Sequence, residues 1–358
     1  MLKGKIKYVV FATLALVLAV SLVAFACAPA AVPEEGAKVT FEAQTWRPST
    51  WLPAGVIWDD LVFIADYITT MSDGRIVVTP TAPGAICPVE EQVDNVAKGL
   101  AEAMDLWPGY YPGKIPLAGL EGGDMIPLKY MYQLVEFWEY FQGGKIAQLL
   151  RADYAKFGDV YWVGPHYWRC PNMINSRVPI PNADAVKGIK FRSSEGISRA
   201  LAKMGAGTIW CPGSEIYTTL ATGVVDAVTY SHAADALAMG FFEVTKYMIT
   251  YPPMCDQTTD AFVVNGTLWN KLTPDLQKMV KSAVTAASWR GCNAADIEIS
   301  KAIKTAVDEY GITLQAWPEE SAQKYRAAMG EVLAEERGRS PECAQFVDLY
   351  FEYVKTIE

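Results

Sequence analysis

The stretch KGIKFRSSEGISRALAKMGAGTIWCPGSEIYTTLATGVVDAVTY, residues 187–230, decides the fold. It predicts short strands at 189–192, 208–212 and 224–230, separated by helices over 196–206 and 214–223. Strands that alternate with helices at this spacing are typical of a parallel α/β sheet. Arg192 ends the first of these strands, and open α/β sheets bind their ligands beyond the carboxyl ends of their strands.

A similar alternation precedes this stretch. Residues 38–46 and 75–80 read as strands on either side of an amphipathic helix, and 102–107 reads as a further strand. The segment DVYWVG, 159–164, is expected to open a second α/β unit, and CDQTTD, 255–260, is expected to be a hinge loop. Residues 274–309 predict a helix of about 50 Å, long enough to span two domains.

These patterns predict an α/β protein of two domains with a cleft and a hinge between them. We expect domain I to hold residues 38–158 and about 250–285. Domain II is expected to hold 159–249 and about 286–358, including the C-terminal helices. Ahead of them, 1–26 has three lysines and then an apolar run, as in an export signal peptide, and 27–37 reads as a tether.

The N-terminal pattern places the body of the protein outside the cytoplasm. Cys27 follows Ala24-Phe25-Ala26, which resembles a bacterial lipoprotein processing site, so we expect lipidation of Cys27 and membrane association through this lipid. Simple cleavage and an uncleaved anchor remain the alternatives. The expected location is the periplasm or the outer face of the cell membrane.

Charge and cysteine content narrow the function further. The net charge of −9 makes nucleic acid an improbable partner. Six cysteines follow Cys27, and their wide spacing builds no zinc site; buried thiols and one or two disulfides are both open.

Signs of catalysis are weak. His166 and His232 are the only histidines, and neither comes with a metal-binding or catalytic pattern. Adjacent acids such as Glu90-Glu91 point about 100° apart on a helix and favour solvated faces. We therefore expect no enzymatic activity, no catalytic residue and no cofactor. A secreted carbohydrate-binding or hydrolytic protein, suggested by the tryptophans and paired acids, is the alternative.

Arg192 differs from the other charged residues. A guanidinium at a strand end inside a cleft is costly unless it is paired, and its planar fork matches a carboxylate through two parallel bonds. An internal salt bridge with Glu195 or Asp184 is the competing explanation.

Three motifs carry a family resemblance: VKGIKFR at 186–192, MGA at 204–206 and PGSEIYTTLATGVVD at 212–226. Together they resemble the signature of DctP-type solute-binding proteins of tripartite ATP-independent periplasmic (TRAP) transporters. The resemblance implies a two-domain periplasmic-binding, or venus-flytrap, fold with a long domain-spanning helix. It also implies a receptor that captures a small organic acid and delivers it to small and large membrane subunits.

The resemblance also implies site residues. The arginine that matches Arg192 holds the ligand carboxylate in the family. A branch that binds 2-oxo acids has Glu-Trp where this chain has Thr229-Tyr230, so we expect no bound metal. Tyr230, Ser231 or His232 is left to close over the ligand. Asn172 is a further candidate, and Trp46, Trp107 and Trp210 are candidates for apolar walls, with core packing as their alternative.

The sequence therefore predicts an extracytoplasmic receptor for a small organic carboxylate, with a 2-oxo or hydroxy monocarboxylate favoured. The sequence does not identify the ligand or the oligomeric state.

Overall fold

The computed structural model describes residues 43–126 and 128–357. Its first group of strands includes a parallel pair and a three-stranded antiparallel sheet with β10 in the centre, in the order β3-β10-β4. The members are β1 Gln44–Trp46, β2 Ile76–Val78, β3 Ala103–Leu106, β4 Val160–Arg169 and β10 Gln257–Asn265. Every residue of β10 is buried.

The second group is a six-stranded sheet in the order β11-β9-β5-β8-β6-β7. Its strands are β5 Ile174–Ser176, β6 Lys190–Arg192, β7 Gly207–Ile209, β8 Ala227–Thr229, β9 Tyr247–Tyr251 and β11 Thr313–Ala316. β6 pairs in parallel with both β7 and β8, whereas β5 is antiparallel to β8 and β9. The stretch that opened the sequence analysis therefore forms three parallel strands of this sheet, as predicted, and β9 and β11 form a second parallel pair.

Helices cover both groups of strands. Those of the first half are α2 Val56–Met71, α3 Gln92–Ala97, α4 Ala118–Glu121, α5 Met131–Val135 and α6 Lys145–Phe157. Those around the second sheet are α7 Glu195–Lys203, α8 Ile216–Ala221, α9 Ala233–Ala238 and α10 Phe241–Val244. The C-terminal half adds α11 Gly266–Asn270, α12 Pro274–Asp308, α13 Glu319–Glu336 and α14 Pro341–Ile357.

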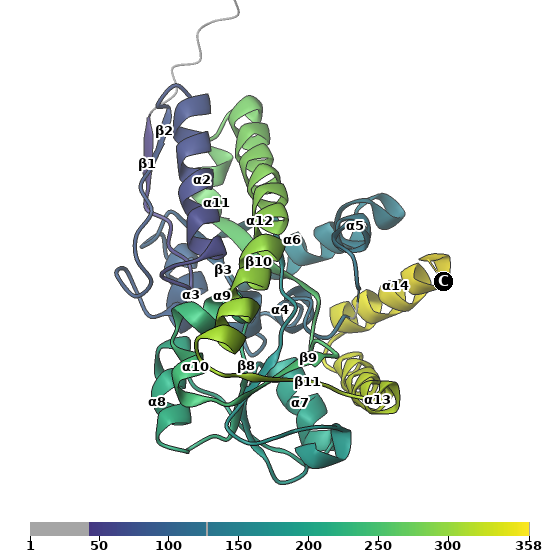
Figure 1. Ribbon diagram of the computed structural model, residues 1–358. Helices are drawn as coiled ribbons and strands as arrows, with labels where there is room; N and C mark the ends of the chain where they lie inside the picture. The colour runs from purple at the N-terminus through teal and green to yellow at the C-terminus, as the bar shows by residue number, and fades with distance from the viewer. Residues whose placement is uncertain (1–42, 127, 358) are drawn as a thin grey trace, which may run out of the picture. The chain divides into compact units, whose positions relative to one another are not determined.

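The long helix α12 joins the two groups. It packs against α2 and β4 of the first group and against α9 beside the second sheet, and it runs next to α2 in Figure 1. Pro274 opens the helix and Asp308 ends it, close to the predicted bounds. The expected mixed α/β fold with a long helix between its two domains is confirmed.

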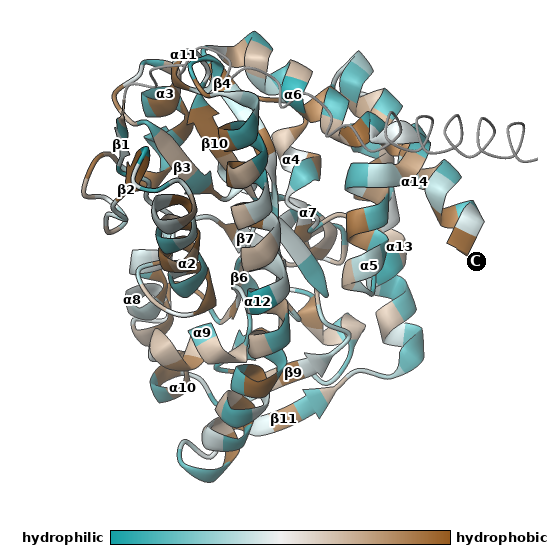
Figure 2. Cartoon of the chain, turned by 90° about the horizontal axis from the view of Figure 1, so that it is seen from above, coloured by the Kyte–Doolittle hydropathy of each residue, from teal (hydrophilic) through white to brown (hydrophobic). Residues whose placement is uncertain are grey.

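Besides the crossing through α12, the chain crosses between the groups where β4 leads to β5 and where β9 leads to β10. These two crossings lie against each other, because Cys170 N–H donates to Asp256 O at 3.0 Å and Asn172 N–H donates to Cys255 O at 2.9 Å. Two hydrophobic cores, one holding Phe137 and Leu106, the other Ile216 and Phe241, account for most buried side chains. Figure 2 shows hydrophobic residues along β10.

Two local expectations were wrong. Residues from Val160 do not start the second sheet but form β4, which pairs with β10 in the first. Asp260 does not lie in a loop: CDQTTD runs into β10, and Asp260 is fully buried opposite His166. The polar composition of CDQTTD suggested an exposed loop, but each of these side chains has a hydrogen-bond or ion-pair partner within the protein. The domain boundaries stay a prediction.

The remaining expectations concern the N-terminal segment and the cysteines. The signal peptide, the tether and Cys27 lie outside the described residues. In the described part, no helix combines the length and the apolar character that a membrane span needs. The six remaining cysteines are unpaired thiols, all buried except the half-buried Cys292.

Candidate functional site

A small cavity lies between the two groups of strands. Its lining comes from the first group through Trp51, Trp107, Tyr110, Asp124, Trp168, Cys170 and Thr258, and from the second through Asn172, Arg192, Ser194, Thr229, Tyr230 and Ser231. The space open to the centre of a water molecule is about 30 Å³. That is room for one or two waters, so the space between the walls is small.

Arg192 enters the cavity from the carboxyl end of β6 and is only 3% exposed. Nε and Nη2 both donate to the carbonyl oxygen of Cys211, at 3.1 and 2.8 Å. The guanidinium carbon lies 4.9 Å from the centroid of the Tyr230 ring, a cation–π contact. The charge is thus held in place by a neutral carbonyl and an aromatic face.

No carboxylate of the described residues lies within 4.0 Å of Arg192. The two acids expected as alternative partners are engaged elsewhere. Glu195 pairs with Arg339 at 2.8 Å, and Asp184 pairs with Lys324 at 3.0 Å. A buried cation without an anion is costly, so the cavity favours an anionic ligand.

Aromatic rings form one wall of the cavity. Trp51 is central: its ring centroid lies 5.8 Å from that of Trp168, 5.9 Å from that of Tyr230 and 6.3 Å from that of Trp107. Tyr110 meets Trp107 edge-on at 5.1 Å. Burial raises the pKa of the Tyr110 phenol to about 12, against the opposing charge of Arg192, so the phenol stays neutral and can donate a hydrogen bond.

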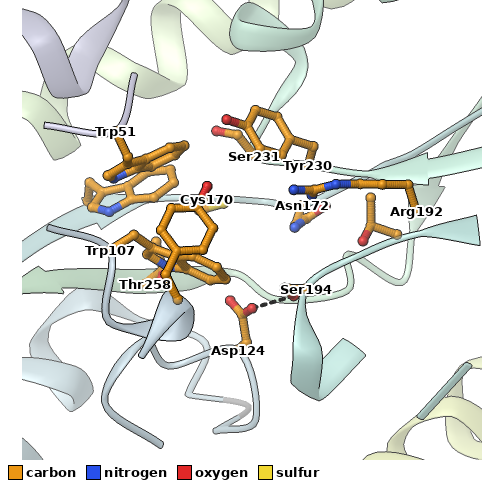
Figure 3. Close-up of a pocket in the computed structure, with 13 residues that line it drawn as sticks. Trp51, Trp107, Asp124, Cys170, Asn172, Arg192, Ser194, Tyr230, Ser231 and Thr258 are labelled. Atoms are coloured by element: carbon orange, nitrogen blue, oxygen red, sulfur yellow. Dashed lines mark hydrogen bonds between the residues drawn. The ribbon is translucent and has the colours of Figure 1, made fainter. Parts of the chain in front are cut away.

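The polar side of the cavity centres on Asp124, which follows α4. The Ser194 hydroxyl donates to Asp124 Oδ2 at 2.6 Å (Figure 3). Burial raises the pKa of Asp124 to about 6, although Ser194, Cys255 and the charge of Arg192 oppose this shift. At neutral pH this carboxyl is mostly ionised and acts as an acceptor.

The segment that carries Asp124 is fixed to β10. Thr258 donates its hydroxyl to Gly122 O, and Thr259 donates to Glu121 O at 2.6 Å. Gly123 adopts φ +77°, and a Cβ there would meet Gln257 O at 3.3 Å. A side chain at Gly123 would therefore strain this turn and shift Asp124.

The family model of bacterial extracellular solute-binding protein, family 7 (DctP), matches residues 50–338. The chain belongs to this family. It is a bacterial extracellular solute-binding protein of the DctP type, the family that the sequence motifs indicated. Members of this family are solute receptors of transport systems.

A curated relative and two solved structures illustrate the similarity. The monocarboxylate 2-oxoacid-binding periplasmic protein of Nostoc sp. is 26% identical over 255 residues, which cover 70% of this chain and 68% of that protein. A TRAP solute-binding protein from Pseudoalteromonas atlantica, with bound sodium and pyruvate, has a TM-score of 0.75 at 22% identity, covering 88% of this chain and 95% of its own. One from Bordetella bronchiseptica, with calcium and picolinate, has a TM-score of 0.77 at 22% identity, covering 87% and 91%.

The cavity of this DctP-type protein brings together five of the seven predicted ligand residues: Arg192, Tyr230, Trp107, Asn172 and Ser231. Ser231 has φ +52° and donates its hydroxyl to Asp235, so its polar atom is already engaged. Asn172 Oδ1 is buried and has no hydrogen-bond partner among the described residues. Contact of these residues with a ligand stays a prediction.

Two predicted tryptophans do not line the cavity. Trp46 lies on β1, fully buried, and its indole N–H donates to Gln44 Oε1 at 2.8 Å. Trp210 follows β7 and is 48% exposed, with its ring edge-on to Tyr110 at 6.0 Å. Trp46 therefore serves the core, and Trp210 lies in an outer groove beside Tyr110.

The residues that sequence reasoning missed come mostly from loops of the first group. Trp51, Trp168 and Tyr110 had no signal to separate them from core aromatics, and Asp124 lies in a turn without a motif. Thr258 looked like part of a hinge loop. Only the register of β10 with β4, which pairs Thr258 with Trp168, brings these residues to one surface.

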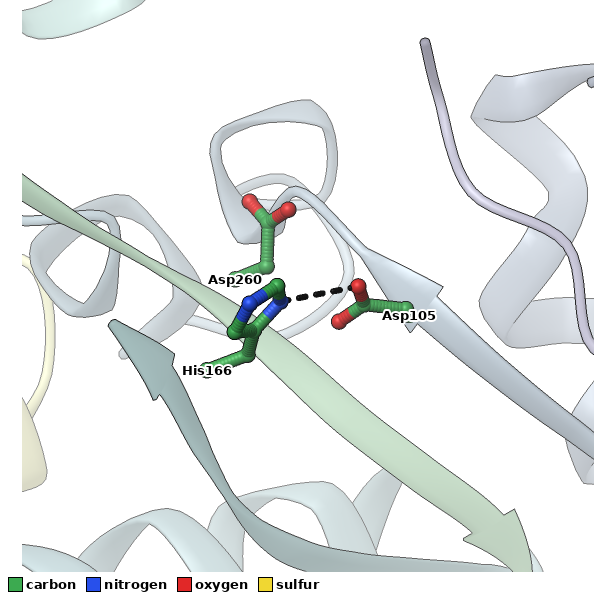
Figure 4. A group of neighbouring side chains, drawn as sticks. All are labelled: Asp105, His166 and Asp260. Atoms are coloured by element: carbon green, nitrogen blue, oxygen red, sulfur yellow. Dashed lines mark hydrogen bonds and ion pairs between the residues drawn. The ribbon is translucent and has the colours of Figure 1, made fainter. Parts of the chain in front are cut away.

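A buried charge cluster contacts the aromatic wall where Trp51 donates to Asp260. Figure 4 shows three of its members, Asp105, His166 and Asp260. His166 Nδ1 contacts Asp105 Oδ2 at 2.9 Å, and its Nε2 contacts Asp60 Oδ2 at 3.3 Å. Burial acts to lower the pKa of His166, but Asp105 and Asp60 together raise it well above its usual value. Arg290 also donates to Asp60.

This cluster is also the group that best resembles a metal site. One donor atom each from Asp105, His166 and Asp260 lie within 4.8 Å of one another. Both imidazole nitrogens, however, already face carboxylates, and a doubly hydrogen-bonded imidazolium has no lone pair for a metal. The arrangement therefore works as a charge network that supports β3, β4 and β10.

Proposed function

We propose that this protein is an extracytoplasmic receptor that binds a small organic carboxylate and delivers it to TRAP membrane subunits. The observation that carries the proposal is Arg192, a buried guanidinium in an aromatic cavity with a carbonyl as its hydrogen-bond acceptor. A ligand carboxylate pairs directly with the guanidinium, as no carboxylate of the described residues does, and burial strengthens the pair. Two relatives with organic acids, pyruvate and picolinate, support this ligand class.

The ligand is small and has an apolar face. The space is narrow, and Trp51, Trp107 and Trp168 cover one side of it. Among the lining residues Asp124 alone carries a carboxylate. Calcium prefers six to eight oxygen ligands, several of them from acids, so we do not assign a cation to this cavity. An N-terminal lipid at Cys27 would keep the receptor close to its membrane partner.

The test is a thermal-shift screen of carboxylates, each paired with its uncharged primary amide. A ligand at a hundred times its Kd stabilises a protein by about 2.7 kcal/mol. We expect one or more carboxylates to raise the Tm and their amides to have no effect. Arg192→Ala should abolish the shift and Arg192→Lys should weaken it, because lysine lacks the planar fork.

Arg337→Ala is the matched control, since Arg337 forms an exposed ion pair with Asp348 at 2.9 Å on the protein surface. It should keep the full shift. Binding of neutral sugars instead of carboxylates, or full affinity in Arg192→Ala, would contradict the proposal.

A further inference from the structure

Asp124 faces the same space as Arg192. In Figure 3 its carboxyl group points into the cavity from below, while the guanidinium of Arg192 enters from the side. The two residues come from different groups of strands, with Asp124 on the turn after α4 and Arg192 at the end of β6. Together they present one acid and one base to whatever occupies the cavity.

Asp124 has donors but no ion-pair partner. Ser194 donates to Oδ2 at 2.6 Å, and no basic nitrogen of residues 43–126 or 128–357 lies within 4.0 Å of the carboxylate. An ionised carboxylate accepts about four hydrogen bonds and donates none. Ser194 leaves part of this acceptor capacity for a ligand.

A second acceptor lines the same cavity. Asn172 is 5% exposed, and its Oδ1 has no partner in the described structure. An unpaired buried acceptor costs free energy until a donor reaches it. Arg192 thus requires an acceptor from the ligand, whereas Asp124 and Asn172 require donors.

We propose that the ligand carries a hydrogen-bond donor, an O–H or N–H, beside its carboxylate, and that Asp124 accepts the hydrogen bond from this donor. This inference rests on the proposed function. The ligand class is then a hydroxy-carboxylate, an amino-carboxylate or an N–H heterocyclic carboxylate. A 2-oxo acid places a second acceptor opposite Asp124, and two acceptors repel each other. The structure therefore favours the hydroxy side of the ligand range expected from the sequence.

Two matched ligand pairs test the inference by calorimetry at pH 8. Pyrrole-2-carboxylate and furan-2-carboxylate are flat rings of similar size, and the first has a ring N–H where the second has a ring oxygen. Lactate has a hydroxyl group where pyruvate has a keto oxygen. A hydrogen bond to a charged group is worth about 1.5–3 kcal/mol. We expect the donor-bearing member of at least one pair to bind at least about tenfold more tightly.

Asp124→Asn provides the variant test. The amide has both a donor and an acceptor, so the preference within each pair should shrink to a few-fold while a carboxylate still binds through Arg192. Asp66→Asn is the control, because Asp66 is an exposed acid on α2, away from the cavity. It should keep the wild-type ratio.

A third readout is the lactate-to-pyruvate affinity ratio at pH 5. Protonated Asp124 can donate to a keto oxygen, so the ratio should fall there. Burial raises the pKa values of the neighbouring Cys170 thiol and Tyr325 phenol, and a hydrogen bond with Cys170, together with burial, raises that of Cys255. These three groups therefore stay neutral between pH 5 and 8.

The outcomes separate the inference from the function beneath it. Three results would overturn the role of Asp124 and leave the receptor proposal intact. They are equal binding within both pairs, tighter binding of the acceptor-bearing members, and binding of another carboxylate but of no donor-bearing member. If no carboxylate binds at all, the proposed function itself fails.

Discussion

Trp51 donates its indole N–H to Asp260 Oδ2 at 2.8 Å, and both residues are buried. The bond links the aromatic wall of the cavity to the charge cluster behind it. Burial and the nearby Asp105 raise the pKa of Asp260 well above its usual value, against the charge of His166 and the bond from Trp51. Burial thus favours the neutral form of the Asp260 carboxyl, which holds a cavity tryptophan in place.

We expect Asp260→Asn to preserve both fold and ligand affinity, because the amide is neutral and still offers an oxygen to Trp51. Asp260→Leu removes the acceptor, leaves a buried N–H unpaired and should cost about 1–3 kcal/mol of unfolding free energy. Chemical denaturation measures the cost, and ligand titration measures the loss of affinity. Equal affinity in the Leu and Asn variants would mean that the bond does not position Trp51.

Glu121 gives a pH prediction for stability. Tyr154 and Trp162 donate to its carboxyl oxygens, yet burial raises its pKa from 4.5 to about 8. A raised pKa means that the folded state holds a proton which the unfolded chain has lost. The contribution of Glu121 to the free energy of unfolding is fully present below pH 4.5. It is lost as pH rises towards 8, by about 1.4 kcal/mol per pH unit.

Glu121→Gln should remove this pH dependence, because glutamine does not titrate. We expect the unfolding free energy of the variant to fall less than that of the wild type between pH 5 and 8, as measured in urea at each pH. Glu331→Gln on exposed α13 serves as control and should follow the wild type. Parallel curves for wild type and Glu121→Gln would contradict the assignment.

Gly291 on α12 allows the buried cluster to form. A Cβ at Gly291 would lie 1.9 Å from Asp60 Oδ2 and 3.2 Å from Val56 Cγ1. Gly291→Ala must therefore displace Asp60 from His166 and Arg290, and we expect a loss of about 2–4 kcal/mol. Gly330→Ala in α13 meets nothing within 4 Å and should instead stabilise by about 0.5–1 kcal/mol. Equal effects of the two substitutions would refute the packing argument.

The sequence predicted the second sheet better than the first. Residues 187–230 alternate between apolar strands and helices that end before a glycine, so local pattern and tertiary structure agree there. The first half of β10 was expected to be a hinge loop because Thr258, Thr259 and Asp260 are polar, and their burial depends on partners more than a hundred residues away.

The candidate site also combines residues that local sequence predicts with residues that only long-range strand pairing brings together. Arg192 could be predicted because its strand-end position and its motif are local features of the chain. Trp51 and Asp124 could not, since only the pairing of β10 with β3 and β4 brings their loops to the cavity. Trp46 was a poor candidate because its strand ends inside the core rather than at an open edge.

Trp107 and Trp210 give a direct test of where the apolar wall lies. Trp107 lines the cavity and contacts Trp51 and Tyr110, whereas Trp210 is half exposed and contacts Tyr110 from outside. With a carboxylate from the screen, Trp107→Ala should weaken binding about tenfold or more, through lost apolar contact. Trp210→Ala should change the Kd less than about threefold, because Trp107 and Arg192 still hold Tyr110. Titration calorimetry at one pH measures both, and a larger loss in Trp210→Ala would move the ligand towards the outer groove.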